Sequence, residues 1–236
     1  MQKIRTLALG CTLLLSTQAV EAALALDRTR VIYNGEVKSV SLNINNDNKQ
    51  QPYLAQAWIE DAENRKITGP LVVVPPVQRL EAGGKSMIRI TSLPAVSSLP
   101  QDRESLFYFN LREIPPRSEK PNVMQIALQT KIKLFYRPAA ITPERGAVWQ
   151  EQLQLIKTAT GYRIENPTPY FVTVIDLTEK GKPGSNISPV MIAPKSAESV
   201  KTPQLHTPVL TYINDYGGRP ELTFNCQGER CQAMKS

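Results

Sequence analysis

Polar and apolar residues alternate from position 39 to position 45, in the order Ser-Val-Ser-Leu-Asn-Ile-Asn. A period of two places Val40, Leu42 and Ile44 on one face of a strand and leaves the other face to water. The same pattern recurs in short segments, at 53–59, 71–74, 87–91, 106–111, 162–165, 171–177 and 221–226. Because 19 prolines and 12 glycines are spread through the chain, long helices are excluded. The pattern predicts an all-β protein.

Turn-forming pairs such as Asn34-Gly35 and Pro183-Gly184 separate these segments at a spacing typical of β-sandwiches. The segment 147–157 comes nearest to a helical period, but the residues after it, Gly161-Tyr162, indicate a hairpin instead. The segment 137–143 contains two prolines and no periodicity. It divides the chain into parts close to the ~100 residues of an immunoglobulin-like sandwich. We therefore predict two sandwich domains of unequal size, 23–142 and 143–236.

The first 22 residues differ in kind from the rest. Lys3 and Arg5 precede a short apolar stretch at 7–15, and Ala22 ends a small-x-small pattern of the type that signal peptidase cleaves. We predict a signal peptide, 1–22, and hence export. Cys11 lies in the apolar stretch, but the residues before it fit a lipidation motif poorly, so we expect it to be removed with the signal. No later segment has the ~18 uninterrupted apolar residues of a membrane span.

Removal of the signal leaves two cysteines, Cys226 and Cys231. An even count in an exported chain favours one disulfide. A metal site is the weaker alternative, because two cysteines are too few ligands and the only histidine, His206, has no companion at a zinc-ligand spacing. An oxidising compartment follows, either extracellular or periplasmic, and we expect no metal and no cofactor.

The net charge of +7 comes from 28 basic and 21 acidic residues, which are interleaved without a block of like charges. Together with export, this argues against a nucleic-acid partner. An enzyme is also disfavoured. The paired acids Glu60-Asp61 and Asp102/Glu104 lie among turn residues, with nothing to place two carboxylates ~5–9 Å apart as a glycosidase requires. No nucleophile elbow accompanies His206.

A secreted adhesin or carbohydrate-binding sandwich is a further alternative. Such a binder should carry a cluster of exposed aromatic residues. The chain has only two tryptophans, Trp58 and Trp149, and both lie in strand-like contexts where burial in the core is the simplest explanation.

The segment 123–135 is the least ordinary part of the sequence. At thirteen residues or more it is about twice as long as a usual strand, with Met124, Ile126 and Leu128 on one side and Gln125 and Ala127 on the other. A core strand is one interpretation. The other is an exposed edge that pairs with a second protein, because a long apolar edge would otherwise aggregate. The proline-rich, polar lead at 115–121 favours the second, since it is typical of a mobile loop.

Two segments carry a family resemblance: Leu-Phe-Tyr-Phe-Asn-Leu-Arg-Glu-Ile-Pro-Pro at 106–116 and Leu-Gln-Thr-Lys-Ile-Lys-Leu-Phe-Tyr-Arg-Pro at 128–138. The chain closely resembles the periplasmic chaperones of the chaperone-usher pilus pathway, and further similar segments lie at 26–30, 46–50, 165–170 and 212–217. The resemblance spans the mature chain in order. It implies two immunoglobulin-like domains joined in an L or boomerang, and a periplasmic location.

The resemblance also implies a function. Such chaperones bind, fold and cap pilin subunits, which lack a final strand, by lending a strand of their own (donor-strand complementation), and then deliver them to an outer-membrane usher. Met124, Ile126 and Leu128 match the lent side chains. Arg30 and Lys133 match the residues that hold the pilin's C-terminal carboxylate.

Lys133 lies an odd number of residues from Ile126 and so on the opposite face, which requires either a strand bulge or an anchor that does not share the donor face. The same exposed strand leaves self-association of the pilin-free protein open.

Further positions are assigned by the resemblance alone. Glu104, Arg137 and Asp215 match an interdomain salt-bridge triad, and Cys226 and Cys231 match the disulfide of the second domain. Val74 departs from the threonine of the family pattern. The positions matching the usher-binding surface are Leu54, Gln56, Pro75, Pro76, Val77 and Arg89.

Overall fold

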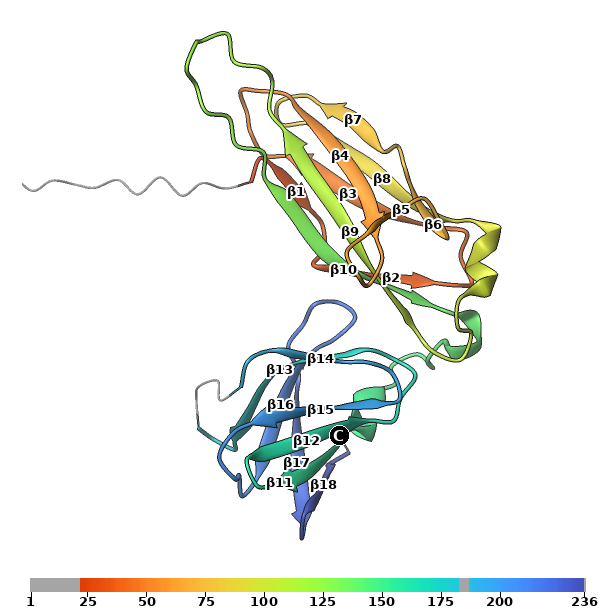
Figure 1. Cartoon of the computed structure of the whole chain (residues 1–236), viewed down its shortest axis with the longest axis vertical. Helices are drawn as coiled ribbons and strands as arrows, with labels where there is room; N and C mark the ends of the chain where they lie inside the picture. The colour runs from red at the N-terminus through yellow and green to blue at the C-terminus, as the bar shows by residue number, and fades with distance from the viewer. Residues whose placement is uncertain (1–21, 183–186, 236) are drawn as a thin grey trace, which may run out of the picture.

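The chain folds into two β-sandwiches, one after the other along the sequence, that meet at an angle (Figure 1). A computed structural model describes residues 22–182 and 187–235, so the predicted signal peptide lies outside the described residues apart from Ala22. Within the described ranges, no helix is long and apolar enough to cross a membrane. The predicted all-β, two-domain fold is confirmed.

The first sandwich consists of two sheets. The smaller has the order β1-β3-β8-β6: β1 is Leu24–Leu26, β3 Ser39–Asn46, β8 Lys85–Ser92 and β6 Leu71–Val74. The larger has the order β2-β10-β9-β4-β5, with β7 also beside β4: β2 is Arg30–Asn34, β10 Gln129–Arg137, β9 Ser105–Ile114, β4 Tyr53–Glu60, β5 Lys66–Ile67 and β7 Val77–Leu80. The strands pair antiparallel, except that β2 and β10 run parallel.

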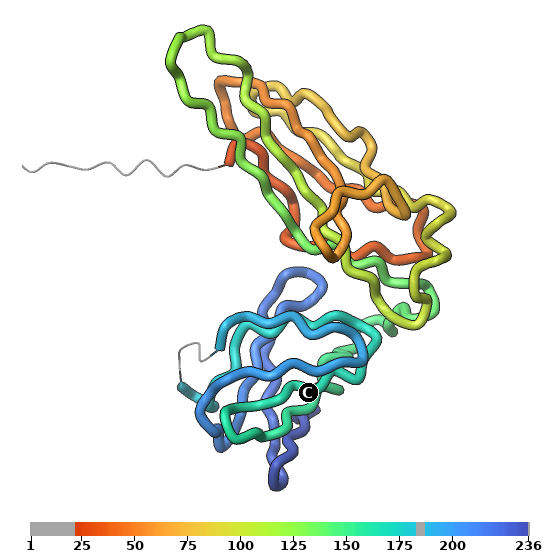
Figure 2. The backbone as a smooth tube through the Cα atoms, viewed as in Figure 1, coloured from red at the N-terminus to blue at the C-terminus, as the bar shows by residue number. Residues whose placement is uncertain are grey.

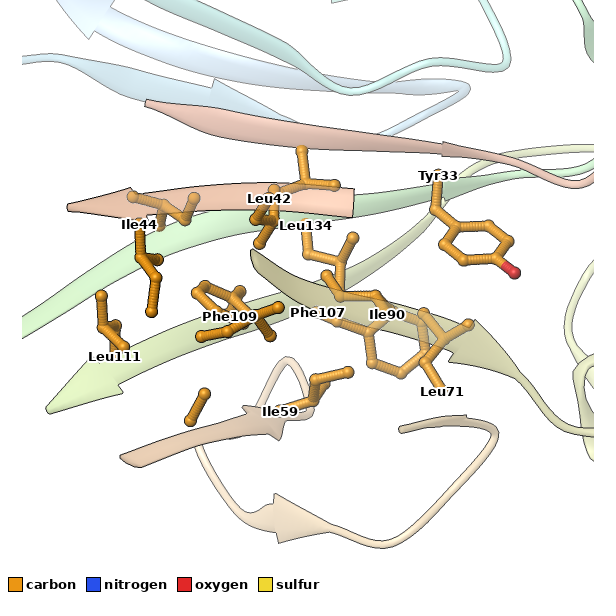
Figure 3. Close-up of a cluster of buried hydrophobic side chains, with 14 of the residues drawn as sticks. Tyr33, Leu42, Ile44, Ile59, Leu71, Ile90, Phe107, Phe109, Leu111 and Leu134 are labelled. Atoms are coloured by element: carbon orange, nitrogen blue, oxygen red, sulfur yellow. The ribbon is translucent and has the colours of Figure 1, made fainter. Parts of the chain in front are cut away.

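Side chains from both sheets fill the space between them (Figure 3). Leu42 and Ile44 of β3 are fully buried, as their alternation predicts, and Val40 packs partly buried against the same core. The alternate residues Phe107, Phe109 and Leu111 of β9 face them from the larger sheet. Period two therefore sets the inward face of both sheets.

The N-terminal strand changes sheets. β1 ends at Leu26 and β2 begins at Arg30, so residues 27–29 cross from the smaller sheet to the larger. Asp27 fixes this crossing: its carboxylate accepts hydrogen bonds from the Asn43 backbone N and side-chain Nδ2, at 3.2 and 2.8 Å. The crossing places Arg30 at the start of β2, opposite Lys133 of the parallel strand β10.

The second sandwich has its own core, centred on Tyr162, Val174 and Phe224. Its strands have the order β14-β13-β16-β17-β18-β11-β12-β15. β17 serves both layers, because residues 221–223 pair with β16 and residues 224–227 pair with β18. The strands are β11 Gln154–Thr158, β12 Gly161–Asn166, β13 Val172–Glu179, β14 Val190–Ile192, β15 Ser196–Lys201, β16 Pro208–Ile213, β17 Glu221–Gln227 and β18 Arg230–Ala233.

Two sequence predictions for the second sandwich are confirmed. The Cys226–Cys231 disulfide is formed and closes the β17–β18 hairpin. Gly161 opens the second strand of a β11–β12 hairpin.

The near-helical stretch at 147–157 supplies only a short 3₁₀ helix, η3 (Trp149–Gln152), before β11 begins. The other 3₁₀ helices are η1 (Pro94–Ser98) and η2 (Ala139–Ile141).

The prediction of one strand over 123–135 is wrong at its start, because β10 begins only at Gln129. The neighbouring strand β9 ends at Ile114 and is followed by two prolines, so residues before 128 have no strand beside them. The last ladder contact is the Glu113 N–H donating to the Leu128 carbonyl, at 3.0 Å. Residues 115–128 instead form a long loop that projects beyond the sandwich (Figure 2).

The two separate cores predict that damage to one domain stays local. Phe109→Ala should destabilise the first sandwich, and Phe224→Ala the second, each by about 3–5 kcal/mol, because both rings are almost fully buried. Native-state hydrogen exchange resolves the two domains. Each variant should speed exchange mainly in its own sandwich; equal acceleration in both would contradict two independent cores.

Candidate functional site

A hollow of about 520 Å³, here called the cleft, opens where the two sandwiches meet. The first sandwich contributes the sheet crossing and the start of β2, and the second contributes the loop between β16 and β17. In Figure 2 this loop reaches from the second sandwich towards the first. The lining residues are Asp27, Arg28, Thr29, Arg30, Ile32, Asp215 and Tyr216.

Arg30 and Lys133 lie side by side at the cleft, as register partners of the parallel strands β2 and β10. One guanidinium nitrogen of Arg30 donates to the Ile213 carbonyl at 3.3 Å. Its Nε is buried and, among the residues that the structure describes, has no hydrogen-bond partner. The Lys133 ammonium donates to the Thr173 hydroxyl at 3.2 Å. Burial lowers the pKa of both groups, and the Arg30 charge lowers that of Lys133 further.

The other charged side chains around the cleft are already engaged in ion pairs. Arg28 pairs with Asp27 at 2.8 Å, and Asp215 pairs with Arg137 at 2.7 Å. Within the described ranges, Arg30 and Lys133 have no ion-pair partner of their own. Glu104 and Asp215, which share Arg137, attract the Arg30 charge without pairing with it directly. Two half-buried cations without a direct ion-pair partner form a site that can bind an anion.

Arg137 joins the two domains through a buried ion network. Its guanidinium donates to the Glu104 carboxylate at 2.8 Å and to both oxygens of Asp215, at 2.7 and 3.1 Å. The second oxygen of Glu104 accepts from the Phe171 backbone N at 2.8 Å. The guanidinium also lies over the Tyr170 ring, 4.8 Å from its centroid. Residues of both sandwiches are therefore tied to one side chain.

Burial raises the pKa of Glu104 to about 7, although the Arg137 charge opposes this shift. A fully formed network holds the walls of the cleft at a fixed angle, because Glu104 and Arg137 belong to the first sandwich and Asp215 and Phe171 to the second. The cation pair thus has a defined geometry before any ligand binds.

The loop that precedes β10, residues 115–128, exposes apolar side chains to water. Met124 is 86% exposed and Ile126 62%, while Leu128 is half-buried. Gln125 is held by its own loop, donating to the Pro116 carbonyl and accepting from the Ser118 N. These residues lead directly into the strand that carries Lys133, so exposed apolar groups and the cation pair share one segment of chain.

β10 pairs with β9 without a register shift from Gln129 to Tyr136, so no bulge lies between Leu128 and Lys133. Ile132 and Leu134 face the core, and Lys133 therefore faces away from it. Of the two alternatives that the sequence left open, the bulge is excluded for the paired part of the strand.

The remaining predicted positions form a band at the far edge of the first sandwich. Gln56 of β4 lies opposite Val77 of β7, and Pro76 accepts a hydrogen bond from the Ala57 N at 2.8 Å. Arg89 of β8 lies opposite Val74, which directly precedes Pro75. Leu54, Val74 and Val77 are large exposed apolar residues. The band continues into a hollow of about 230 Å³ lined by Leu54, Ile114 and Pro115 among others.

Sequence reasoning did not single out Thr173, Ile114 or Tyr216. Thr173 and Ile114 lie within strands, and only the pairing of distant segments gives them their neighbours. Tyr216 carries a usable signal, because an aromatic residue within the turn sequence Asn-Asp-Tyr-Gly-Gly cannot enter a core.

Comparison with known proteins finds matches over most of the chain. The profile of the family "Pili and flagellar-assembly chaperone, PapD N-terminal domain" matches residues 23–142, and that of "Pili assembly chaperone PapD, C-terminal domain" matches 148–224. The chaperone protein PapD of Escherichia coli is 62% identical over 218 residues, which is 91% of each chain.

Solved structures show the same fold. The periplasmic chaperone SfaE superposes with a TM-score of 0.69 and 33% identity, over 84% of this chain and 95% of that one. A chain of the Salmonella enterica complex between the SafA pilin and the SafB chaperone gives a TM-score of 0.74 and 25% identity, over 89% and 99%.

Both halves of the chain thus define a chaperone of pilus assembly, a class of binding protein rather than of enzyme. The chain belongs to the PapD family of pilus-assembly chaperones.

The raised pKa of Glu104 predicts a pH dependence. A carboxyl group whose folded-state pKa rises from 4.5 to about 7 contributes stability below pH 4.5 that is lost as pH rises through about 7. Glu104→Gln removes the titration and keeps an oxygen for Arg137. In the variant, the free energy of unfolding should lack this part of its pH dependence, which is at most about 1.4 kcal/mol per pH unit.

Urea unfolding of both proteins at about pH 5 and about pH 7 measures the difference. The wild type should gain stability relative to the variant at the lower pH. A difference between the two proteins that does not change with pH would contradict the assignment.

Proposed function

We propose that this chaperone holds an immunoglobulin-like pilin subunit that lacks its last strand, by lending residues 123–128 as that strand and binding the subunit's C-terminal carboxylate with Arg30 and Lys133. One observation carries the proposal: Lys133, one of two neighbouring cations without a direct ion-pair partner, lies in the strand that follows residues 123–127. In the described part of the chain, these residues expose apolar side chains and form no ladder hydrogen bond. The SafB chaperone, solved in complex with the SafA pilin, supports the same class of partner.

The lent segment contributes affinity through its backbone and its side chains. An extended peptide beside an incomplete sheet forms ladder hydrogen bonds, and alternate side chains enter the groove. Met124, Ile126 and Leu128 alternate in this way. Burying each contributes roughly 1.5–3 kcal/mol before the costs of association are subtracted. The free loop has no strand beside it, which leaves its backbone available to the pilin.

The cation pair fixes the register. A carboxylate between Arg30 and Lys133 would supply the direct ion-pair partner that both lack. Sliding the pilin by one residue would leave two half-buried charges unpaired, so one alignment is favoured. The ion network of Arg137 serves this purpose indirectly, because it holds the cleft open at one angle.

The domains act as units, 23–142 and 143–236, after removal of the signal peptide 1–22. The band of Leu54, Gln56, Pro75, Pro76, Val77 and Arg89 is the surface for an outer-membrane usher, and its exposed apolar residues support a protein contact. The periplasm is the site of action, in keeping with the disulfide and with the periplasmic chaperone SfaE.

The first test of this function removes the anchor. Arg30→Ala or Lys133→Ala should leave the protein folded and weaken pilin binding by about 2–5 kcal/mol, the scale for an unpaired buried charge. Lys131→Ala is the matched control, because Lys131 lies on the same face of β10 but already pairs with Glu60. A pull-down of co-expressed pilin that is unchanged in both anchor variants would refute the anchor.

The second test concerns the lent strand. Ile126→Asp should weaken pilin capture more than Gln125→Asp, because only residue 126 would enter the groove. Ala127→Asp serves as a second control on the opposite side of the segment, and Ala127 is exposed in the free protein. Competition between variants for one co-expressed pilin measures the order. Equal losses at all three positions would remove the face assignment.

A further inference from the structure

Tyr216 is an aromatic side chain that the fold leaves in water. It is 96% exposed, whereas every other aromatic residue in the described ranges is buried or half-buried. Its hydroxyl makes no hydrogen bond to the part of the chain that the structure describes. A tyrosine in such a position adds nothing to the core, so its value lies in a contact with another molecule.

Tyr216 stands at the wall of the cleft. It lines the same 520 Å³ hollow as Arg30 and Ile32. It also lines an adjoining hollow of about 350 Å³, together with Val148 and the linker before it. The residue therefore lies between the anion site and a second hollow of mixed polarity on the second sandwich.

The turn that carries Tyr216 is rigid. The Asn214 side-chain oxygen accepts hydrogen bonds from the Tyr216 N at 3.1 Å and from the Gly218 N at 2.8 Å. The Asn214 carbonyl accepts from the Gly217 N at 3.0 Å. Asn214 thus holds the turn through both its side chain and its backbone carbonyl. The Tyr216 ring is therefore held in place before any ligand binds.

The turn also packs against Thr29, the residue directly before the strand that carries Arg30. Gly217 has φ +82°, and a Cβ added to it would lie 2.5 Å from the Thr29 hydroxyl oxygen. Only glycine permits this approach. Asp215 is held by Arg137, and Ile213 accepts from Arg30. The position of Tyr216 relative to Arg30 is consequently fixed.

We propose that Tyr216 is a specificity-determining residue, whose ring packs on the last side chain of a bound pilin and selects an apolar or aromatic residue there. The inference rests on the proposed function, since it needs the pilin carboxylate at Arg30 and Lys133. A carboxylate is the same at the end of every chain, so the cation pair alone cannot tell one terminus from another. A rigid ring beside it supplies this discrimination, and by excluding water it strengthens the ion pairs.

The test uses the mature protein and synthetic peptides of about ten residues, a usual strand length or slightly more. The peptides alternate valine and threonine, are acetylated at the N-terminus and end in phenylalanine or in serine with a free carboxylate. A C-terminal amide of each is the control for the anchor. Affinities come from chemical-shift titration of isotope-labelled chaperone, with wild type, Tyr216→Ala, Tyr216→Phe and Arg30→Ala compared.

The wild type should bind the phenylalanine peptide about five- to tenfold more tightly than the serine peptide. Tyr216→Ala should abolish this preference and Tyr216→Phe should keep it, while the unfolding midpoint of both variants stays unchanged because the ring is exposed. A merely structural residue would move the midpoint and leave the preference intact.

The arms separate two kinds of failure. If amidation and Arg30→Ala weaken binding but the preference is absent in the wild type or survives in Tyr216→Ala, the role of Tyr216 is wrong and the anchor stands. If amidation and Arg30→Ala change nothing, or if no peptide binds the wild type, the proposed function fails and the role of Tyr216 with it.

Discussion

Two neighbouring cations without a direct ion-pair partner in the described part of the chain are the constraint on which the rest of the structure depends. Arg30 and Lys133 come from parts of the chain about a hundred residues apart, and only the parallel pairing of β2 with β10 makes them neighbours. Like charges at adjacent positions repel, and partial burial adds to the cost. Such a pair requires a surrounding structure that holds the two side chains in place. A bound anion would offset their repulsion.

The surrounding structure supplies that support. Asp27 fixes the crossing that delivers Arg30 to β2, and Arg137 ties the first sandwich to the second through Glu104 and Asp215. Gly217 lets the second sandwich approach Thr29 closely. A network of this kind contributes modestly to stability, because burying its charges offsets much of their attraction. Its importance lies in geometry, since a carboxylate must meet both cations at once.

How far the sequence could predict this structure depends on the range of each interaction. Alternation is local, so Leu42 and Ile44 were assigned correctly, and the even cysteine count correctly indicated the disulfide. Alternation also extended β10 too far, because the pattern of residues 123–128 is the same whether their partner strand belongs to this chain or to another. The meeting of Glu104, Arg137 and Asp215 has no local signal; family resemblance named them, and the fold brings them into one network. The role of Tyr216 could not be predicted from its neighbours in the sequence, because it depends on Arg30, which lies on the other sandwich and lines the same cleft.

The central claim is that residues 123–128 are an unpaired strand that a pilin completes. Amide hydrogen exchange of these residues, in the free protein and in the complex with a co-expressed pilin, tests it most directly. The account predicts fast exchange in the free protein, where no strand lies beside them, and strong protection at alternate amides in the complex. Exchange that remains fast in the complex would contradict the account, because the pilin would then be held by some other surface.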